Sequence, residues 1–329
     1  MNTNNTWLKP GFLFSEDDFA RKMGELVRPF QEAHYLSGDF PGCDFQKIHY
    51  TQIIHPQARA AIVISHGFCE FSGKYDEMIY YFYQMGYSVF FLEHRGHGFS
   101  YRSTEDLDKV DAIRFYDYVD DLKCFLDMVV RPNCPNLPLY LYGHSMGGAI
   151  AAAFLEEYPG YFKAAILSSP MMQMTLGKFP EWAVRLLAAY KLFRKKGEDY
   201  IMGSHGFDGI DIFEKSSSLS RARYEYVMDM RRAVKQYRTY GGTYRWIATS
   251  LRAQKKIIKK AGRIQIPVRL FQAGLDYKVQ PRGQEKFAQR AQIAIHRYPQ
   301  SKHEIFNATT EMRKQYYDEI FRFLEQQEN

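Results

Sequence analysis

The stretch GHSMGG at 143–148 places a single serine, Ser145, between glycines. An apolar run typical of a strand precedes it at 137–142, and small residues typical of a closely packed helix follow it. In the pattern G-x-S-x-G, the glycines allow a strand-to-helix turn so tight that larger residues would collide with the neighbouring backbone. The serine projects from that turn. We therefore predict that Ser145 is a nucleophile and not an incidental serine in a glycine-rich turn.

A serine nucleophile needs two helpers. Its hydroxyl is weakly reactive at neutral pH, so a base must lie within hydrogen-bond reach and a carboxylate must orient that base. In the setting of G-x-S-x-G the chain order is serine, acid, histidine. Asp276 follows an apolar strand that ends at Gly274, and His303 lies in the loop after the last predicted strand. We predict that Ser145, Asp276 and His303 form a catalytic triad.

Other histidines and carboxylates compete for these roles. His296 lies within the predicted strand at 293–298, where a side chain packs or faces solvent more often than it reaches a site. Asp208 and Asp211 lie in a long insertion, away from the end of any predicted strand. These positions favour His303 as the base and Asp276 as the acid.

Acyl transfer also needs donors for the oxyanion of its tetrahedral intermediate. One backbone N–H comes from the residue after the nucleophile and another from a loop after an earlier strand, which points to Met146 and Phe68. Glu70, beside that loop, is predicted to be a polar contact to substrate or a solvated loop charge. His66 and His144 are expected to brace and pack the turns and not to act in catalysis.

Short apolar runs alternate with helix-like periodic patterns from about residue 60 onward. The runs that predict strands are 60–65, 87–93, 137–143, 163–169, 266–274 and 293–298. Helices are predicted at 74–86 and 113–131, then from about Pro281 and from about Ala308. Such alternation predicts an α/β fold with a mostly parallel sheet flanked by helices.

Two local features refine this expectation. The stretch at 34–54, with its Pro-Gly turn, predicts a hairpin that adds antiparallel edge strands. The helix at 113–131 is expected to end before Pro132, because proline does not continue a helix.

The segment 171–265 differs from its flanks. Its pattern is mainly helical, most clearly at 181–193 and 220–238, and its Lys and Arg outnumber its Asp and Glu by 20 to 8. It therefore carries a net charge of +12, whereas the remaining residues carry −5. Loops at the carboxyl ends of parallel strands surround the site in such folds. We expect residues 1–170 and 266–329 to form the core and 171–265 to form a helical cap.

The composition limits the protein classes that fit. A chain of 329 residues with 46% hydrophobic and 25% charged residues is typical of a soluble globular protein. No apolar run approaches the roughly 20 residues that cross a bilayer, and the opening residues lack a secretory-signal pattern. The cysteines Cys43, Cys69, Cys124 and Cys134 have neither C-x-x-C spacing nor the density of a disulfide scaffold. We expect free thiols and a cytoplasmic location.

Several motifs together resemble a known family. HGFCEFSGKY, EHRGHGFS, GHSMGG, AGLDYKV and KHEIF are similar to the successive motifs of monoacylglycerol lipases and bacterial PldB-type lysophospholipases, within the α/β-hydrolase superfamily. The resemblance spans about residues 30–325, and FYDYVDDL at 115–122 and GGTYRWI at 241–247 favour the lysophospholipase side. One departure is Glu93, where relatives commonly have aspartate before R-G-H-G.

The resemblance implies an α/β-hydrolase fold and a serine esterase or lipase that needs no metal or organic cofactor. Ser145, Asp276 and His303 would carry the triad, with Phe68 and Met146 at the oxyanion hole. The implied substrate is a glycerolipid with one acyl chain, foremost a lysophospholipid. A monoacylglycerol or a small carboxylic ester is the alternative.

Apolar side chains of the predicted cap have two interpretations. They line a tunnel for the acyl chain, or they form the cap's own core. The residues are Phe179, Trp182, Leu186, Leu187, Leu192 and Phe193. The positive charge of the cap favours peripheral contact with an anionic membrane, at its inner face, over a merely solvated basic surface.

Two other classes of function compete with a lipid esterase. One is a hydrolase of a soluble small ester or peptide, since fold alone does not settle function. The other is a non-catalytic lipid- or nucleic-acid-binding protein on the same scaffold. Such a scaffold is expected to lack a member of the triad, and all three are present. Nucleic acid is not expected as a partner, because no recognition module is evident. The sequence leaves the oligomeric state open.

Overall fold

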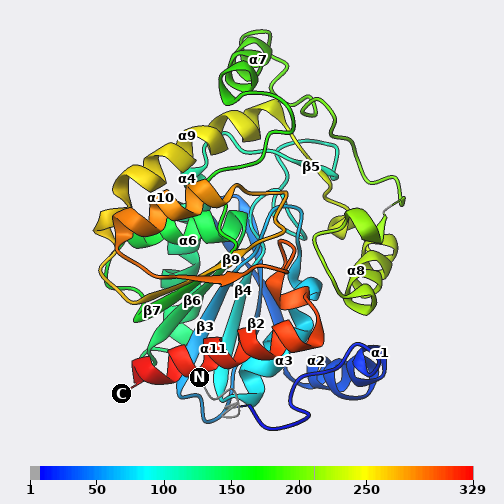
Figure 1. The fold of residues 1–329 in the computed structure, drawn as a ribbon, viewed down its shortest axis with the longest axis vertical. Coiled ribbons are helices and arrows are strands. Elements are labelled where there is room, and N and C mark those ends of the chain that lie inside the picture. The colour runs from blue at the N-terminus through cyan, green and yellow to red at the C-terminus, as the bar shows by residue number, and fades with distance from the viewer. Residues whose placement is uncertain (1–7, 211, 329) are drawn as a thin grey trace.

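A computed structural model describes residues 8–210 and 212–328. Within them, an eight-stranded sheet has the order β1-β2-β4-β3-β6-β7-β9-β10 (Figure 1). The antiparallel pairs are β1 (Leu36–Pro41) with β2 (Lys47–Ile53) and β2 with β4 (Tyr87–Leu92). The other strands are β3 (Ala60–Ser65), β6 (Leu139–His144), β7 (Ala164–Ser168), β9 (Val268–Ala273) and β10 (Ile295–Tyr298), all in parallel pairs. The predicted mostly parallel sheet with its hairpin is confirmed.

Helices cover both faces of the sheet, which explains why every residue of β3, β4, β6 and β7 is buried. One face carries α4 (Tyr116–Phe125), α6 (Met146–Glu157), α9 (Tyr244–Lys260) and α10 (Pro281–Ala291). The other face carries α3 (Asp76–Gln84) and α11 (Thr310–Glu328), with α1 (Phe19–Lys22) and α2 (Arg28–His34) at its edge. The core is therefore two apolar layers, one on each side of the sheet.

The helix predicted to end before Pro132 continues past it. A π-helical turn at Leu126–Val130 leads into α5 (Arg131–Asn133), which has Pro132 in its first turn. The first turn of a helix has no intrahelical acceptor for its N–H groups, so a residue without an N–H fits there. The chain does the same at Met23–Val27, a π-helical turn that leads into α2 and its Pro29. The expectation was wrong because a π-helical turn precedes Pro132 and the helical segment that contains it runs on to Asn133.

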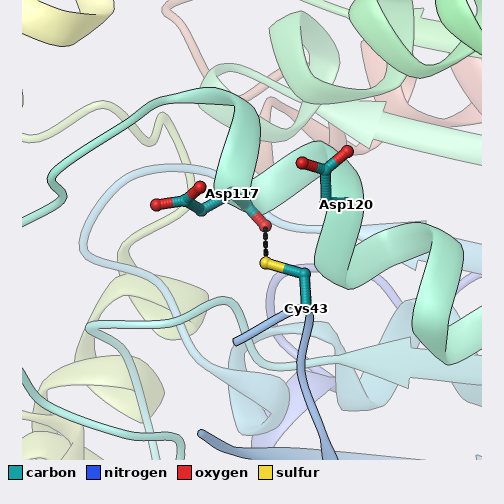
Figure 2. A group of neighbouring side chains, drawn as sticks. All are labelled: Cys43, Asp117 and Asp120. Carbon is teal, nitrogen blue, oxygen red and sulfur yellow. Dashed lines mark hydrogen bonds between the residues drawn. The ribbon is translucent and has the colours of Figure 1, made fainter. Parts of the chain in front are cut away.

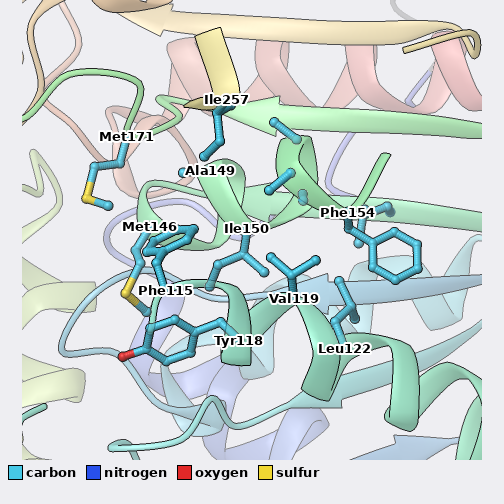
Figure 3. Packing of buried hydrophobic residues seen from close by; sticks show 14 of the residues in the cluster. Phe115, Tyr118, Val119, Leu122, Met146, Ala149, Ile150, Phe154, Met171 and Ile257 are labelled. Carbon is cyan, nitrogen blue, oxygen red and sulfur yellow. The ribbon is translucent and has the colours of Figure 1, made fainter. Parts of the chain in front are cut away.

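The segment 171–265 contributes α7 (Glu181–Phe193), α8 (Arg221–Ala233) and α9, and β8 (Gly241–Gly242) pairs with β5 (Lys109–Val110). At the top of Figure 1, α7 protrudes from the body. In contrast, α9 packs on α6 and α10 as well as on α7, and Figure 3 shows Ile257 of α9 beside Ala149 of α6. We therefore propose that the cap within 171–265 ends before α9, which belongs to the core layer.

Two further expectations concern thiols and membranes. All four cysteines are free thiols, as predicted. In the parts of the chain that the structure describes, no helix combines the length and the apolarity needed to cross a bilayer.

The packing of α9 on the core predicts a large loss of stability for Ile257→Ala. Ile257 is fully buried, so truncation removes apolar contacts and leaves a cavity, at a cost of about 2–5 kcal/mol in the free energy of unfolding. Ile113→Ala is the matched control, because Ile113 is 67% exposed and its truncation should change that free energy by less than about 0.5 kcal/mol. Urea unfolding measures both, and equal small losses would contradict the packing of α9 on the core.

Candidate active site

Ser145 occupies the single residue between β6 and α6, in a strained backbone conformation. Its φ of 52° and ψ of −117° lie outside the regions that residues with a side chain ordinarily adopt. Two hydrogen bonds hold the strained peptide: the Ser145 N–H donates to the Ser168 carbonyl at 3.0 Å, and the Ser145 carbonyl accepts from the Met171 N–H at 2.8 Å. The serine is therefore fixed at the carboxyl end of the sheet.

The glycines around Ser145 are required by close backbone approach. A Cβ atom on Gly143 would lie 2.8 Å from the Gly147 carbonyl oxygen. A Cβ atom on Gly147 would collide with the carbonyl of Ser65 at the end of β3. The turn thus presses against the neighbouring strand, as the G-x-S-x-G pattern predicts.

Asp276 and His303 lie side by side. Asp276 follows β9 and His303 follows β10, and the His303 Nδ1 and Asp276 Oδ2 atoms are 2.6 Å apart. The other carboxylate oxygen of Asp276 accepts from the N–H groups of Lys278 and Val279 at 2.8 and 3.0 Å. Burial favours a raised pKa for Asp276, but the hydrogen bond and charge of His303 outweigh it and lower that pKa. The carboxylate is therefore ionised and oriented toward the histidine ring.

Ser145 and His303 line the same cavity, which has a volume of about 670 Å³. The His303 ring lies 4.9 Å, centroid to centroid, from the ring of His144, the residue before the serine. The structure thus brings the three predicted residues together at the carboxyl ends of β6, β9 and β10. Their joint action as a triad is our proposal.

The competing residues lie elsewhere. His296 on β10 has its Nε2 2.6 Å from a nitrogen of Arg269 and its Nδ1 2.9 Å from a carboxylate oxygen of Glu319. Asp208 accepts a hydrogen bond from the N–H of Ile210 in an exposed loop. Asp211 lies outside the described residues. The arrangement of the described residues therefore favours His303 and Asp276.

The two predicted oxyanion donors have open N–H groups. Met146 is the first residue of α6, so its N–H has no intrahelical acceptor. The N–H of Gly67 donates to a buried carboxylate at 2.6 Å and that of Cys69 to the His97 ring at 3.1 Å. Between them, the N–H of Phe68 takes part in no hydrogen bond among the described residues. We propose that Phe68 and Met146 bind the oxyanion.

Glu70 is buried and held by three donors. Its carboxylate accepts from the Gly67 N–H, from the Tyr75 hydroxyl at 2.5 Å and from the Lys74 ammonium at 2.8 Å. Burial favours a raised pKa for Glu70, but Lys74 dominates and holds that pKa well below its usual range. The alternative interpretation of Glu70 as a solvated loop charge is therefore wrong, since only 4% of the residue is exposed. Glu70 supports the loop that carries Phe68, and its predicted contact with substrate stays a prediction.

Buried histidines brace the same loops. His66 Nδ1 lies 2.7 Å from the Gly67 carbonyl oxygen, and His66 Nε2 accepts from the N–H of His94 at 3.0 Å. His144 Nδ1 lies 3.2 Å from the Ser168 carbonyl oxygen, and burial lowers the pKa of His144 to about 4. These rings are neutral near pH 7 and hold backbone turns, as the sequence analysis expects.

Glu93, the departure from the common aspartate, joins two loops. Its carboxylate accepts from the N–H and hydroxyl of Ser72 at 3.2 and 3.0 Å and from the N–H of Phe99 at 2.7 Å. A Cβ atom on Gly98 would collide with this carboxylate. The Glu93 side chain, which is longer than aspartate, therefore fills the space beside Gly98. It joins the loop after β4 to the segment that follows Phe68.

Figure 2 shows a thiol and two carboxylates in the arrangement of a metal site, Cys43, Asp117 and Asp120. Both carboxylates already form ion pairs with Arg114, at 3.0 and 3.3 Å. Burial raises the pKa of the Cys43 thiol to about 12, so this sulfur is protonated and donates to the Asp117 carbonyl. Ion pairs and a hydrogen bond within the protein therefore already occupy the groups of this cluster that would bind a metal.

The cavity wall differs from the predicted acyl tunnel. Phe179, Trp182, Leu186 and Phe193 on or beside α7 are 54 to 85% exposed and do not border the cavity, so they form neither a tunnel nor the core of the cap. The apolar side chains that border the cavity include Phe68, Met171, Met174, Ile210, Ile212, Val227, Met228, Trp246 and Val279. One face of α8 borders the cavity at positions 223, 227 and 231, which recur at helical spacing; Val227 and the adjacent Met228 are its apolar part, whereas Arg223 and Arg231 are basic. That spacing is the signal through which the sequence analysis could have found this wall.

The model of the family described as serine aminopeptidase, S33, matches residues 56–310. The chain belongs to this family. Lysophospholipase L2 of Escherichia coli strain K12 is 29% identical to this S33 chain over 259 residues, which are 78% of the chain and 76% of that relative. Human monoglyceride lipase is 30% identical over 213 residues, 64% and 62% of the two chains.

A solved structure agrees in fold with this S33 protein. The carboxyl esterase of Bacillus coagulans, crystallised with glycerol, superposes with a TM-score of 0.73 at 19% identity, over 90% of this chain and 99% of that one. The predicted α/β-hydrolase fold and the resemblance to monoacylglycerol lipases and lysophospholipases are confirmed.

The positions of Asp276 and His303 predict that both are needed for turnover. His303→Ala removes the base and should lower kcat by about 10⁶-fold, and Asp276→Asn removes the charge that orients it and should lower kcat by about 10⁴-fold. His296→Ala is the control and should change kcat less than fivefold, because His296 binds Arg269 and Glu319 away from the cavity. Hydrolysis of p-nitrophenyl butyrate measures kcat. An inactive His296→Ala beside an active His303→Ala would refute the assignment.

Proposed function

We propose that the protein is a serine esterase that hydrolyses the ester of a monoacyl glycerolipid, foremost a lysophospholipid. The observation that supports this most is that Ser145 and His303, which is paired with Asp276, border one cavity of about 670 Å³ whose wall includes apolar side chains. A wall of that kind accepts an acyl chain, and the paired groups cleave an ester. The names of the lysophospholipase and monoglyceride lipase relatives support this substrate class.

The mechanism follows from the geometry of the site. The His303 ring accepts the proton of Ser145 as the hydroxyl oxygen attacks the ester carbonyl, and Asp276 stabilises the imidazolium that forms. The N–H groups of Phe68 and Met146 bind the oxyanion of the tetrahedral intermediate. The intermediate collapses to an acyl-enzyme, and His303 returns its proton to the departing glycerol oxygen. A water molecule, activated by the same histidine, then releases the fatty acid.

The substrate preference is tested by a panel of esters. Wild-type protein should hydrolyse palmitoyl lysophosphatidylcholine and monopalmitoylglycerol faster than diacyl phosphatidylcholine. Ser145→Ala should lower each rate at least ~10³-fold, because the nucleophile is lost. Ser37→Ala, on the edge strand β1, is the control and should keep full activity.

An aminoacyl p-nitroanilide belongs in the same panel, because the family description names an aminopeptidase. The proposal predicts no measurable hydrolysis of this amide. If the protein cleaved the amide faster than both monoacyl lipids, the proposal of a lipid esterase would be wrong and the competing proposal of a peptide hydrolase would be favoured.

We also propose that α7 attaches the protein peripherally to anionic membranes. Trp182 and Leu186 on one face of the helix are 66% and 63% exposed, and Phe193 at its end is 85% exposed. Arg194, Lys195 and Lys196 follow directly and are exposed. Aromatic and apolar side chains beside basic ones are the composition of helices that lie at a lipid interface. This arrangement suits attachment at the cytoplasmic face of a membrane, where anionic lipids gather.

A second group of basic residues, Lys255 and Lys260 on α9, is less available for lipid. Lys255 pairs with Glu181 at 3.0 Å, and Lys260 pairs with Glu157 at 2.5 Å. These ammonium groups are neutralised within the protein, so the run after α7 carries more of the proposed attraction.

Vesicle binding should therefore depend on the α7 end of the protein. Neutralising Arg194, Lys195 and Lys196 to glutamine should abolish cosedimentation with phosphatidylglycerol vesicles at low salt, since each basic residue near such a surface contributes about 1 kcal/mol. Neutralising Lys255 and Lys260 should leave most binding intact. Binding of wild-type protein to neutral phosphatidylcholine vesicles as strong as to anionic ones would contradict the electrostatic part of the proposal.

A further inference from the structure

Arg231 is a buried cation on the wall of the catalytic cavity. It lies on α8 with 9% of its surface exposed, and it borders the cavity together with Ser145 and His303. Its Nη2 donates to the Cys69 carbonyl, whereas its Nε has no hydrogen-bond partner and is shielded from solvent. The rings of Phe71 and Tyr240 lie 5.8 and 6.0 Å from the guanidinium carbon.

The other buried cations of the wall are neutralised by carboxylates. Lys74 contacts Glu70 and Glu304 at 2.8 and 2.7 Å, and Arg223 contacts Glu77 at 2.7 Å. Among the described residues, no carboxylate lies within ion-pair distance of Arg231. A buried, uncompensated guanidinium is costly unless an anion binds to it, so its retention beside a catalytic serine points to a ligand.

Two exposed lysines extend the positive charge of the same wall. Lys215 and Lys278 border the cavity beside Arg231 and lie on the surface. The carboxylates of the described wall, Glu70 and Glu304, both face Lys74. Among the described residues of the wall, the charges without a carboxylate partner are therefore positive, and Arg231 is the buried one.

The place of Arg231 relative to the scissile bond follows from Cys69. That residue comes directly after Phe68, whose N–H we assign to the oxyanion hole. Two residues of chain and one hydrogen bond separate that N–H from the guanidinium, a span of at most about 10 Å. In a lysophospholipid, the three-carbon glycerol separates the ester from the phosphate by a comparable distance, so Arg231 lies within reach of the phosphate of a bound ester.

We propose that Arg231 binds the phosphate of a lysophospholipid head group and makes the enzyme prefer lysophospholipids over monoacylglycerols. This inference rests on the proposed esterase function and deepens it. The planar guanidinium donates in a fork that matches two phosphate oxygens. A monoacylglycerol presents no anion there and leaves the guanidinium unpaired in the cavity, which disfavours its binding. Arg231 is thus a specificity-determining residue.

Binding of two non-hydrolysable single-chain probes tests the proposal directly. Dodecylphosphocholine carries the phosphodiester, and 1-O-dodecylglycerol has the same chain without it. By calorimetry below their micellar concentrations, Arg231→Gln should weaken binding of dodecylphosphocholine at least about tenfold and leave that of dodecylglycerol within about twofold. Arg232→Gln is the matched control: the neighbouring arginine pairs with Asp229 at the surface, so both affinities should be unchanged.

The quantity to compare is the ratio of the affinities for dodecylphosphocholine and dodecylglycerol. If Arg231 had a purely structural role, its substitution would not change this ratio. An equal loss for both probes, or an unchanged ratio, overturns the proposal. If circular dichroism shows that Arg231→Gln does not fold, Arg231→Lys decides, because lysine keeps the charge without the fork and should lower the ratio severalfold. Inorganic phosphate is the third probe, and binding as tight as that of dodecylphosphocholine would identify a free-phosphate site instead of a head-group site.

Kinetics separates this inference from the proposed function. Arg231→Gln should lower kcat/KM for palmitoyl lysophosphatidylcholine about tenfold relative to kcat/KM for monopalmitoylglycerol. If wild-type protein hydrolyses neither lipid, the proposed function fails, and the two binding probes still decide whether Arg231 selects a phosphate. If both lipids are hydrolysed and the ratio is unchanged in Arg231→Gln, the inference fails alone.

Discussion

The close approach of the turn after β6 to the end of β3 is the constraint on which the site depends. Gly147 passes so near the Ser65 carbonyl that no side chain fits between them, and this contact fixes where α6 begins. Ser145 is left in a backbone conformation that costs about 1–3 kcal/mol and persists because Ser168 and Met171 hold both sides of its peptide. The Ser145 hydroxyl and the open N–H of Met146, our proposed nucleophile and oxyanion donor, are thereby positioned in the folded protein.

Buried ion pairs hold the loops around this turn in place. Glu70 and Glu304 both bind Lys74, so the oxyanion loop is joined to the segment that contains His303. Arg223 of α8 binds Glu77, which fastens one wall of the cavity to α3 on the core. In a low-dielectric interior, loss of one partner leaves an uncompensated charge, so these pairs fix the geometry of the site more than they add stability. Arg231 differs from these cations because no carboxylate of the described residues lies within ion-pair distance of it.

The strands, their mostly parallel pairing and the tight turn at Ser145 were predictable because they depend on local pattern and on tight sterics. Asp276 and His303 were selected as candidate acid and base because each follows a strand end. Other features depend on contacts that no local pattern contains. The burial of Glu70 requires Lys74 and Tyr75 to close over it, and the exposure of Trp182 shows that an apolar helical stripe need not face protein. The relation of Arg231 to the cavity required the position of α8.

The central claim is that Ser145 is the nucleophile of this cavity, and covalent trapping tests it most directly. Wild-type protein is treated with a fluorophosphonate and digested, and the modified peptide is identified by mass spectrometry. The account predicts one phosphonylated serine, Ser145, and no adduct on protein unfolded in urea, because the reactivity depends on the folded site. An adduct on another cavity serine such as Ser217, or equal labelling of folded and unfolded chains, would contradict it.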